Sequence, residues 1–152
     1  MKTIEQLTIT DLNNVTEDKT VSIIVWEEEC ILSSAYFYKE NKQIAPFFDK
    51  IKELLSWFDK SKAEIVQSIN DKFIGTVQEW VAENNLQDTI SEDDFCNSLS
   101  LSEIDFCIGD IDDEPLINIY LVCTPDYFLG HAICCYLKKE NDEIKCNFVL
   151  EG

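Results

Sequence analysis

The residues best suited to chemistry lie in one short stretch, DYFLGHAICCYL, which contains the single histidine of the chain and two of its seven cysteines. A cysteine nucleophile needs a histidine within hydrogen-bond reach, about 3 Å. In a β-strand, Cys134 points to the opposite face from His131, and Cys135 lies roughly 13 Å away on the same face. We therefore predict that His131 is a structural residue at the start of a strand. A partner for its ring on another strand, such as Cys123 or Cys146, is the alternative.

Neither a metal nor a cofactor is indicated by the remaining motifs. Structural zinc sites draw ligands from close pairs such as Cys-x-x-Cys, and the sequence has no such pair and no second histidine. The acidic turn DIDDEP places Asp110, Asp112 and Glu114 at the first, third and fifth positions of an EF-hand loop. Its sixth and twelfth positions are Pro115 and Leu121, where that loop needs glycine and glutamate. We expect a solvated turn, and a chain with four glycines offers no glycine-rich phosphate loop.

The charge of the chain is strongly negative and unevenly distributed. The chain has thirty acidic and twelve basic residues, giving a net charge of −18, and every basic residue is a lysine. Such a chain repels a nucleic-acid backbone and lacks the arginine that grips phosphate. No basic residue occurs between Lys72 and Lys138, so one surface should be acidic. This surface serves either solubility or docking of a basic partner protein. The candidate partner-binding residues are Glu92, Asp93, Asp94, Asp110, Asp112, Asp113 and Glu114.

The compartment can be inferred from the chain start and the cysteines. The sequence has no run of eighteen apolar residues, and MKTIEQLTITDL is too polar for a signal peptide, so we expect no membrane association. Most of the cysteines sit in apolar strand-like segments, where a free thiol behaves as a small hydrophobe. Seven is also an odd number for a disulfide framework. We expect reduced thiols and a cytoplasmic protein.

Hydrophobic periodicity divides the chain into a β-rich segment over 1–43, a helical segment over 44–99 and a β-meander over 100–152. In the first segment, Val21 to Trp26 and Ser33 to Lys39 are the expected strands of a hairpin, and Ile4 to Thr10 is a possible further strand. Pro46 opens a helix, and SKAE is a capping box that begins a second helix at Ser61.

A third, short helix is expected from Ser91, which repeats the capping pattern with Asp94. Beyond Ser100 the period changes to two, and four strands follow as an antiparallel meander. The order of elements predicts a single α+β domain, with an N-terminal hairpin, two to three helices and the meander joined in one mixed-to-antiparallel sheet.

The chain from about Ile44 to Gly152 resembles an uncharacterised bacterial family, the domain of unknown function numbered twenty-two sixty-two. The resemblance rests on the helix pair, on SEDDFCNSLSLSEIDF, on a Phe-x-Gly-His-x-Ile signature in FLGHAI and on the final FVLEG. Leu129 stands where the signature usually has an aromatic residue. The resemblance implies an α+β fold, a bacterial source and an architectural role for the signature, and it brings no catalytic residues. The matching residues are Phe128, Gly130, His131 and Ile133.

Two functions from different classes follow. The first is a non-enzymatic cytosolic protein, immunity-like or an adaptor, that binds a basic protein through its acidic surface. The second is a small-molecule binder or hydrolase-type enzyme with a pocket near His131, since histidine suits proton transfer at neutral pH. Its candidate catalytic residues are His131, Asp126 and Asp110, with Tyr127 close by. A scaffold domain without a discrete site is a third possibility.

Overall fold

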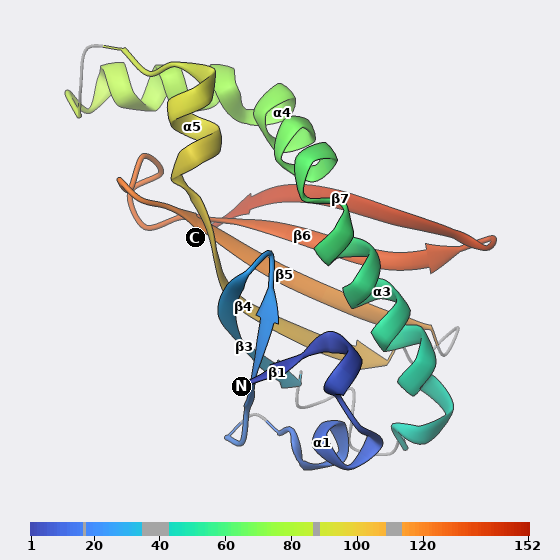
Figure 1. Cartoon of the computed structure of the whole chain (residues 1–152). Coiled ribbons are helices and arrows are strands. Elements are labelled where there is room, and N and C mark those ends of the chain that lie inside the picture. The colour runs from blue at the N-terminus through green and yellow to red at the C-terminus, as the bar shows by residue number, and fades with distance from the viewer. Residues whose placement is uncertain (17, 35–42, 87–88, 109–113) are drawn as a thin grey trace.

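The chain folds around a single seven-stranded sheet in which the strands lie in chain order, β1 to β7 (Figure 1). The structure is a computed structural model that describes residues 1–16, 18–34, 43–86, 89–108 and 114–152. The strands are β1 (Lys2–Thr3), β2 (Val21–Val25), β3 (Glu28–Ser34), β4 (Leu99–Ile108), β5 (Pro115–Cys123), β6 (Ala132–Glu140) and β7 (Glu143–Glu151). The predicted α+β class is confirmed.

The sheet is mixed, and its strand count and arrangement differ from the prediction. The pairs β1/β2 and β3/β4 are parallel, and the other neighbours are antiparallel. The short strand β1 was not expected. The segment proposed as a first strand, Ile4 to Thr10, instead contains a 3-10 helix (Ile4–Gln6) and the beginning of helix α1 (Ile9–Asn14). Thr8 starts α1 because its side chain accepts a hydrogen bond from the Asp11 amide at 3.1 Å.

The N-terminal hairpin is displaced from its predicted position. Its turn lies at Trp26 and Glu27, which have φ values of 56° and 63°, so the last three residues of the acidic EEEC belong to β3. The Trp26 amide donates to Asp59 Oδ1 at 2.7 Å, its indole N–H donates to the Phe58 carbonyl at 2.8 Å, and its ring stacks on Phe58. These tertiary contacts hold the start of the turn at Trp26, the last residue of the predicted first strand. The rest of the predicted strand, 35–39, lies outside the described residues.

Three helices follow the hairpin: α3 (Phe48–Lys60), α4 (Lys62–Glu83) and α5 (Glu92–Ser98). A 3-10 turn (Ala45–Phe47) with proline at its start precedes α3. The predicted cap at Ser91 is confirmed, since its side chain accepts from the Asp94 amide at 3.1 Å. The predicted helix start at Ser61 is confirmed, since α4 begins at Lys62, but the predicted capping box is wrong because Ser61 makes no side-chain cap bond. Only one residue separates α3 from α4, so Ser61 cannot adopt the extended backbone of a normal N-cap.

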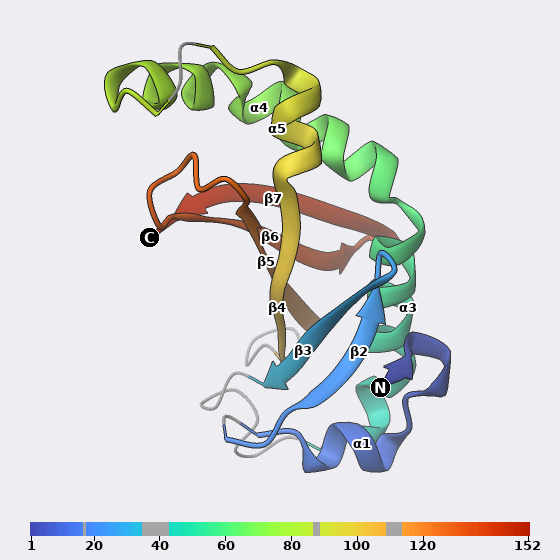
Figure 2. The same ribbon diagram turned by 60° about the vertical axis from the view of Figure 1, so that its left-hand side comes forward.

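The helices α3 and α4 lie along one face of the sheet and enclose the core (Figure 2). Alternate residues of β4 to β6 are fully buried on this side, as period-two strands with one covered face require. The helices contribute the opposing apolar stripe. The principal core residues of the strands are Leu32, Ile104, Phe106, Ile117, Ile119, Leu121, Ile133, Cys135 and Leu137, and those of the helices are Ile51, Leu54, Leu55, Phe58, Ile65 and Ile69.

None of the described helices combines the length and apolar character needed to cross a lipid bilayer.

Candidate functional site: the open face of the sheet

The second face of the sheet is not covered by a helix in the described part of the chain, and it displays a concentrated set of polar and aromatic groups. The pairing registers place these groups in rows across the strands. Asp105 of β4 lies beside Asn118, which lies beside Tyr136. In the next row Tyr120 separates Glu103 from Cys134. Because side chains alternate along a strand, both rows point away from the core. We call this surface the open face.

Two carboxylates of the open face, those of Asp105 and Glu151, are partly withdrawn from water. Asn118 Nδ2 donates to Asp105 Oδ1 at 2.9 Å, and the Tyr136 hydroxyl donates to Glu151 Oε1. Burial raises the pKa of Asp105, and the neighbouring charges of Glu103 and Glu151 raise it further, while the Asn118 bond opposes the shift. This end of the face thus gathers the carboxylates of Glu103, Asp105 and Glu151, and neither of the two rows of described residues contains a cation.

The two tyrosines of the open face remain protonated under all ordinary conditions. Burial is the main cause that raises the pKa of Tyr120, followed by the charge of Asp105. The hydrogen bond to Glu151 is the main cause that raises the pKa of Tyr136. Both phenols therefore act as hydrogen-bond groups and flat contact surfaces, and neither is a base at neutral pH.

The two cysteines on this face, Cys107 and Cys134, are not activated nucleophiles. Cys134 is fully buried, and burial raises the pKa of its thiol to about 11. The same cause raises the pKa of Cys107 to about 11 and that of Cys30 to about 12. Hydrogen bonding to Cys146, with burial, raises the pKa of Cys135. A reactive cysteine needs the opposite shift, toward thiolate at neutral pH. All seven cysteines are free.

The lysines of the open face are confined to its other end. Lys138 and Lys145 lie in the next row, beside Leu116 and two residues beyond the asparagine and tyrosine row. Lys145 Nζ is already 2.8 Å from Glu143. The open face is consequently polarised, with the acidic and aromatic groups at one end and the lysines toward the hairpin between β6 and β7.

The signature residue Phe128 is the centre of an aromatic cluster and does not belong to the open face. Its side chain is 1% exposed. Its ring meets Phe73 and Trp80 of α4 edge-on at centroid distances of 6.3 and 5.7 Å, and Phe95 of α5 at 6.1 Å. Edge-to-face pairs at these distances add to the stability gained from burial. The loop between β5 and β6 is thereby fastened to both helices.

The single histidine is held by the same loop. The Phe128 carbonyl lies 3.1 Å from the His131 amide and 2.8 Å from its ring Nδ1, so Nδ1 carries a proton and donates. Trp80 contacts the ring edge-on at 5.2 Å, and a methyl group built at Gly152 would overlap the imidazole. His131 precedes β6 by one residue and is half-buried.

The other residues proposed for a catalytic group near His131 have different surroundings. Asp126 is exposed, and its Oδ1 accepts a hydrogen bond from the Gly130 amide at 3.1 Å, which closes the turn. Gly130 has a φ of 91°, a conformation that favours glycine. Tyr127 is 5% exposed. Asp110 lies outside the described residues.

The residues proposed for partner binding fall into separate groups. Glu92, Asp93 and Asp94 are exposed in the first turn of α5, where acidic side chains favour the helix N-terminus. Glu114 lies at the other end of β4 and pairs with Lys50 of α3 at 2.8 Å. The ten residues of β4 separate these groups by roughly 30 Å. Asp110, Asp112 and Asp113 lie outside the described residues.

The grouping of the open-face residues was not predicted from the sequence, because a single polar residue on the solvent side of a strand is common. The signal was present in EIDFCIG and LINIYLVC, where acidic, amide and phenol groups alternate with core residues. Only the registers between β4, β5 and β6 bring Asp105, Tyr120 and Tyr136 together, and a one-residue change of register would move them to the other face.

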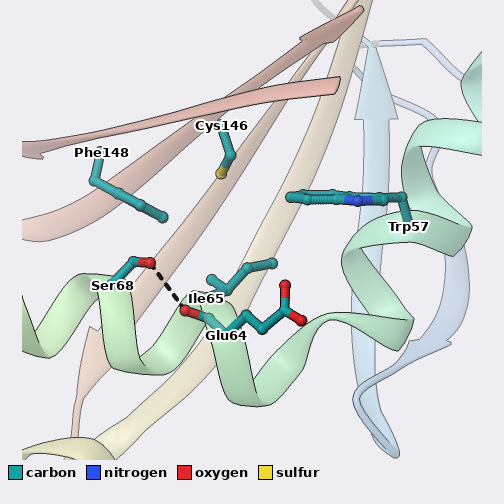
Figure 3. Close-up of a pocket in the computed structure, with 6 residues that line it drawn as sticks. All are labelled: Trp57, Glu64, Ile65, Ser68, Cys146 and Phe148. Carbon is teal, nitrogen blue, oxygen red and sulfur yellow. Dashed lines mark hydrogen bonds between the residues drawn. The ribbon is translucent and has the colours of Figure 1, made fainter. Parts of the chain in front are cut away.

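A pocket of about 230 Å³ lies on the helix side, next to the edge strand β7 (Figure 3). Trp57 of α3 and Phe148 of β7 face each other across it, and Ile65 of α4 lies beneath them. Glu64 and Ser68, both exposed, lie at its polar margin. Within the described ranges, no three His, Cys, Asp or Glu side chains are arranged to hold a metal ion.

Comparison with known proteins places the chain in a family. The family model described as "Uncharacterized protein conserved in bacteria (DUF2262)" matches residues 11–147. The chain belongs to this family. The match begins in α1 and includes the N-terminal hairpin, so it extends further toward the N-terminus than the resemblance found over 44–152. No curated protein and no solved structure matches the chain.

Proposed function

We propose that this DUF2262 protein is a non-enzymatic binding protein, immunity-like or an adaptor, and that its open face docks onto a basic partner protein. The observation that carries the proposal is the pattern of Tyr120 and Tyr136 among the carboxylates of Glu103, Asp105 and Glu151, on a sheet face without a covering helix in the described chain. The proposal thus assigns docking to this face instead of to the acidic residues of 92–94 and 110–114 that were predicted from the sequence.

The composition of the open face suits protein recognition. Tyrosine supplies a large, rigid and amphipathic contact area, and it is enriched at protein interfaces. A lysine or arginine of the partner could pair with a carboxylate and lie over a neighbouring phenol ring. The net charge of −18 would speed association with a basic protein, most strongly at low salt.

Two further observations favour binding over catalysis. The pKa values of Cys30, Cys107 and Cys134 are raised, which keeps their thiols protonated and weakly nucleophilic at neutral pH. The His131 ring is engaged with the Phe128 carbonyl through Nδ1. We infer that the protein works in the cytoplasm, where free thiols are kept reduced.

The proposal can be tested with a charge-reversal pair of equal net charge. Glu103→Lys changes an exposed carboxylate of the open face, and Glu83→Lys changes an exposed carboxylate at the end of α4. Immobilised wild-type protein and both variants would be used to capture proteins from the bacterial extract. Captured proteins would then be purified, and their dissociation constants measured at low and high salt.

We expect a basic protein that binds the wild type and Glu83→Lys alike, binds Glu103→Lys about tenfold more weakly, and binds all of them less tightly at high salt. Equal affinity for both variants, or an affinity independent of salt, would contradict docking on the open face.

A further inference from the structure

The strand β7 ends the sheet, and no strand in the described part of the chain pairs with its outer edge. It is nine residues long and partly exposed along its whole length. Unpaired strand edges of this length are usually blocked in soluble proteins, because they accept further strands. The opposite edge of the sheet is the two-residue strand β1.

The register between β6 and β7 determines which backbone groups point outward from this edge. The strands are joined by a two-residue turn, Asn141 and Asp142, both with positive φ, and Glu140 pairs with Glu143. In such a hairpin the first pair is hydrogen-bonded, and bonded pairs then alternate with non-bonded pairs. The residues whose N–H and C=O groups point away from β6 are Ile144, Cys146, Phe148 and Leu150.

One side-chain contact independently supports this assignment. Lys72 Nζ of α4 donates to the Phe148 carbonyl, which is possible only if that carbonyl points outward. The contact also resembles the lysine guards that protect exposed strand edges. The Phe148 carbonyl is therefore directed toward the space where an additional strand would lie.

The side chains of two of these residues form one wall of the pocket beside the edge. Cys146 and Phe148 line it together with Trp57 and Ile65 (Figure 3). In an antiparallel pair, directly opposite residues point to the same side of the sheet. An added strand would therefore direct every second side chain toward this apolar pocket, and the intervening side chains would extend the open face.

We propose that β7 is a strand-addition site, where an extended segment of the basic partner binds antiparallel to residues 143–151 with apolar side chains toward the Trp57 and Phe148 pocket. The basic character of the segment rests on the proposed function. Its position is set by Glu143 and Glu151, which lie at the two ends of β7 on the open-face side. Lysine or arginine opposite these residues would complete opposite-charge cross-strand pairs.

Pairing with a second copy of the chain along the full length of this edge is disfavoured. Two β7 strands that pair antiparallel about Asn147 would place Glu143 of each copy beside Glu151 of the other, and like charges directly opposite are destabilising. Each copy also carries a net charge of −18. A segment with basic ends avoids both penalties.

The test uses the synthetic peptide Lys-Val-Thr-Leu-Thr-Leu-Thr-Val-Lys, whose lysines would lie opposite Glu143 and Glu151 and whose leucines would lie opposite Cys146 and Phe148. Its affinity for the whole protein would be measured by fluorescence anisotropy. N-methylation of the two leucines removes the amides that bond to β7, whereas N-methylation of two threonines changes amides that point outward. We expect the first peptide to bind about tenfold more weakly and the second to retain its affinity.

Hydrogen exchange supplies a readout at the edge itself. On binding, the amides of Ile144, Cys146, Phe148 and Leu150 should exchange more slowly. The intervening amides of β7, already bonded to β6, should change little. Protection confined to residues of the open face would overturn the strand-addition site.

Variants of the pocket distinguish this site from the open face. Ser68→Phe fills the pocket margin, and Gln67→Phe adds the same ring at the neighbouring exposed position of α4. We expect the first to weaken peptide binding about tenfold and the second to leave it unchanged within about twofold. Equal effects, or no binding of the peptide to the wild type, would overturn the inference. If the peptide did not bind but a salt-sensitive partner still depended on Glu103, the proposed docking on the open face would stand without the strand-addition site.

Discussion

Phe128 and His131, in the motif FLGHAI, make their main contacts within the protein. The Phe128 ring fastens the loop between β5 and β6 to α4 and α5, and its carbonyl accepts hydrogen bonds from both the amide and the ring of His131. Gly130 provides the positive φ that returns the chain to β6. At this scale the motif serves to join the sheet to the helices.

Truncation of Phe128 should show how much stability this cluster supplies. We expect Phe128→Ala to lower the free energy of unfolding by about 3 to 5 kcal/mol, since a buried ring and three edge-on contacts are lost. Leu129→Ala, at a side chain that is 48% exposed, should change it by less than about 0.5 kcal/mol. Urea unfolding monitored by circular dichroism measures both. Similar values for the two variants would contradict the anchoring role.

Asp105 leads to a prediction about pH. Its pKa is raised from the ordinary value of 3.8, chiefly by burial, so the ionised form destabilises the folded protein. The contribution of this carboxyl to stability is therefore fully present below about pH 3.8 and is lost as the pH rises through its higher folded pKa.

We expect Asp105→Asn to be more stable than the wild type at pH 7, and the difference to disappear near pH 3.5. Chemical unfolding across this pH range measures the effect, with Asp93→Asn in the exposed first turn of α5 as control. A wild-type advantage at pH 7 would show that the Asn118 bond outweighs the cost of burial.

The surroundings of a residue could be predicted only where its neighbours in space are also close in the sequence. Strand alternation was enough to separate His131 from Cys134. The grouping of Asp105, Tyr120 and Tyr136 was not predictable, because it depends on registers between strands. Likewise, nothing near Trp26 in sequence indicates its bonds to Phe58 and Asp59, more than thirty positions away.

The helices and the later strands illustrate which elements a pattern predicts well. The apolar stripes of α3 and α4 and the alternation of β5 extend over many residues, so their type is clear from the sequence. Short elements are decided by a few specific bonds. Ser61 looked like a helix cap, but the one-residue link between α3 and α4 gives it a different backbone conformation.

Two glycines, one in helix α4 and one in the turn before β6, provide a matched test of backbone conformation. A Cβ would meet no atom within 4 Å at either Gly75 or Gly130, but only Gly130 has a positive φ. Gly75→Ala in α4 should raise the free energy of unfolding by about 0.5 to 1 kcal/mol, and Gly130→Ala should lower it by about 1 kcal/mol or more. Thermal unfolding of both variants decides this, and a change of the same sign in both would contradict it.

In the described part of the chain, helices cover one face of the sheet, and the chain as a whole carries a large excess of negative charge. The helix side of the sheet supplies the core, whereas the open face and the outer edge of β7 lie outside this helical cover in the described part of the chain. Thirty acidic residues in a chain of this length must repel one another in the folded state. Long-range repulsion of this kind is weakened by salt.

We therefore expect the midpoint of thermal unfolding to rise as sodium chloride increases from about 10 mM to about 500 mM, where the Debye length falls to a few ångströms. Differential scanning fluorimetry measures the shift. Sodium sulfate stabilises proteins generally, so the chloride series is the informative one. A midpoint that falls with sodium chloride would indicate that favourable ion pairs, such as Lys139 with Glu53, outweigh the repulsion.

The parallel pairing between β3 and β4 has a consequence for synthesis on the ribosome. Ile31 lies beside Glu103, 72 positions later in the chain, so the N-terminal hairpin cannot gain its second neighbour until α3, α4 and α5 have been translated. At bacterial elongation rates of about 5 to 20 residues per second, this interval lasts several seconds. During that time the nascent hairpin exposes Leu32 and Val25, which are fully buried in the native protein. Chaperones that bind emerging apolar segments would meet this protein first at its amino-terminal end.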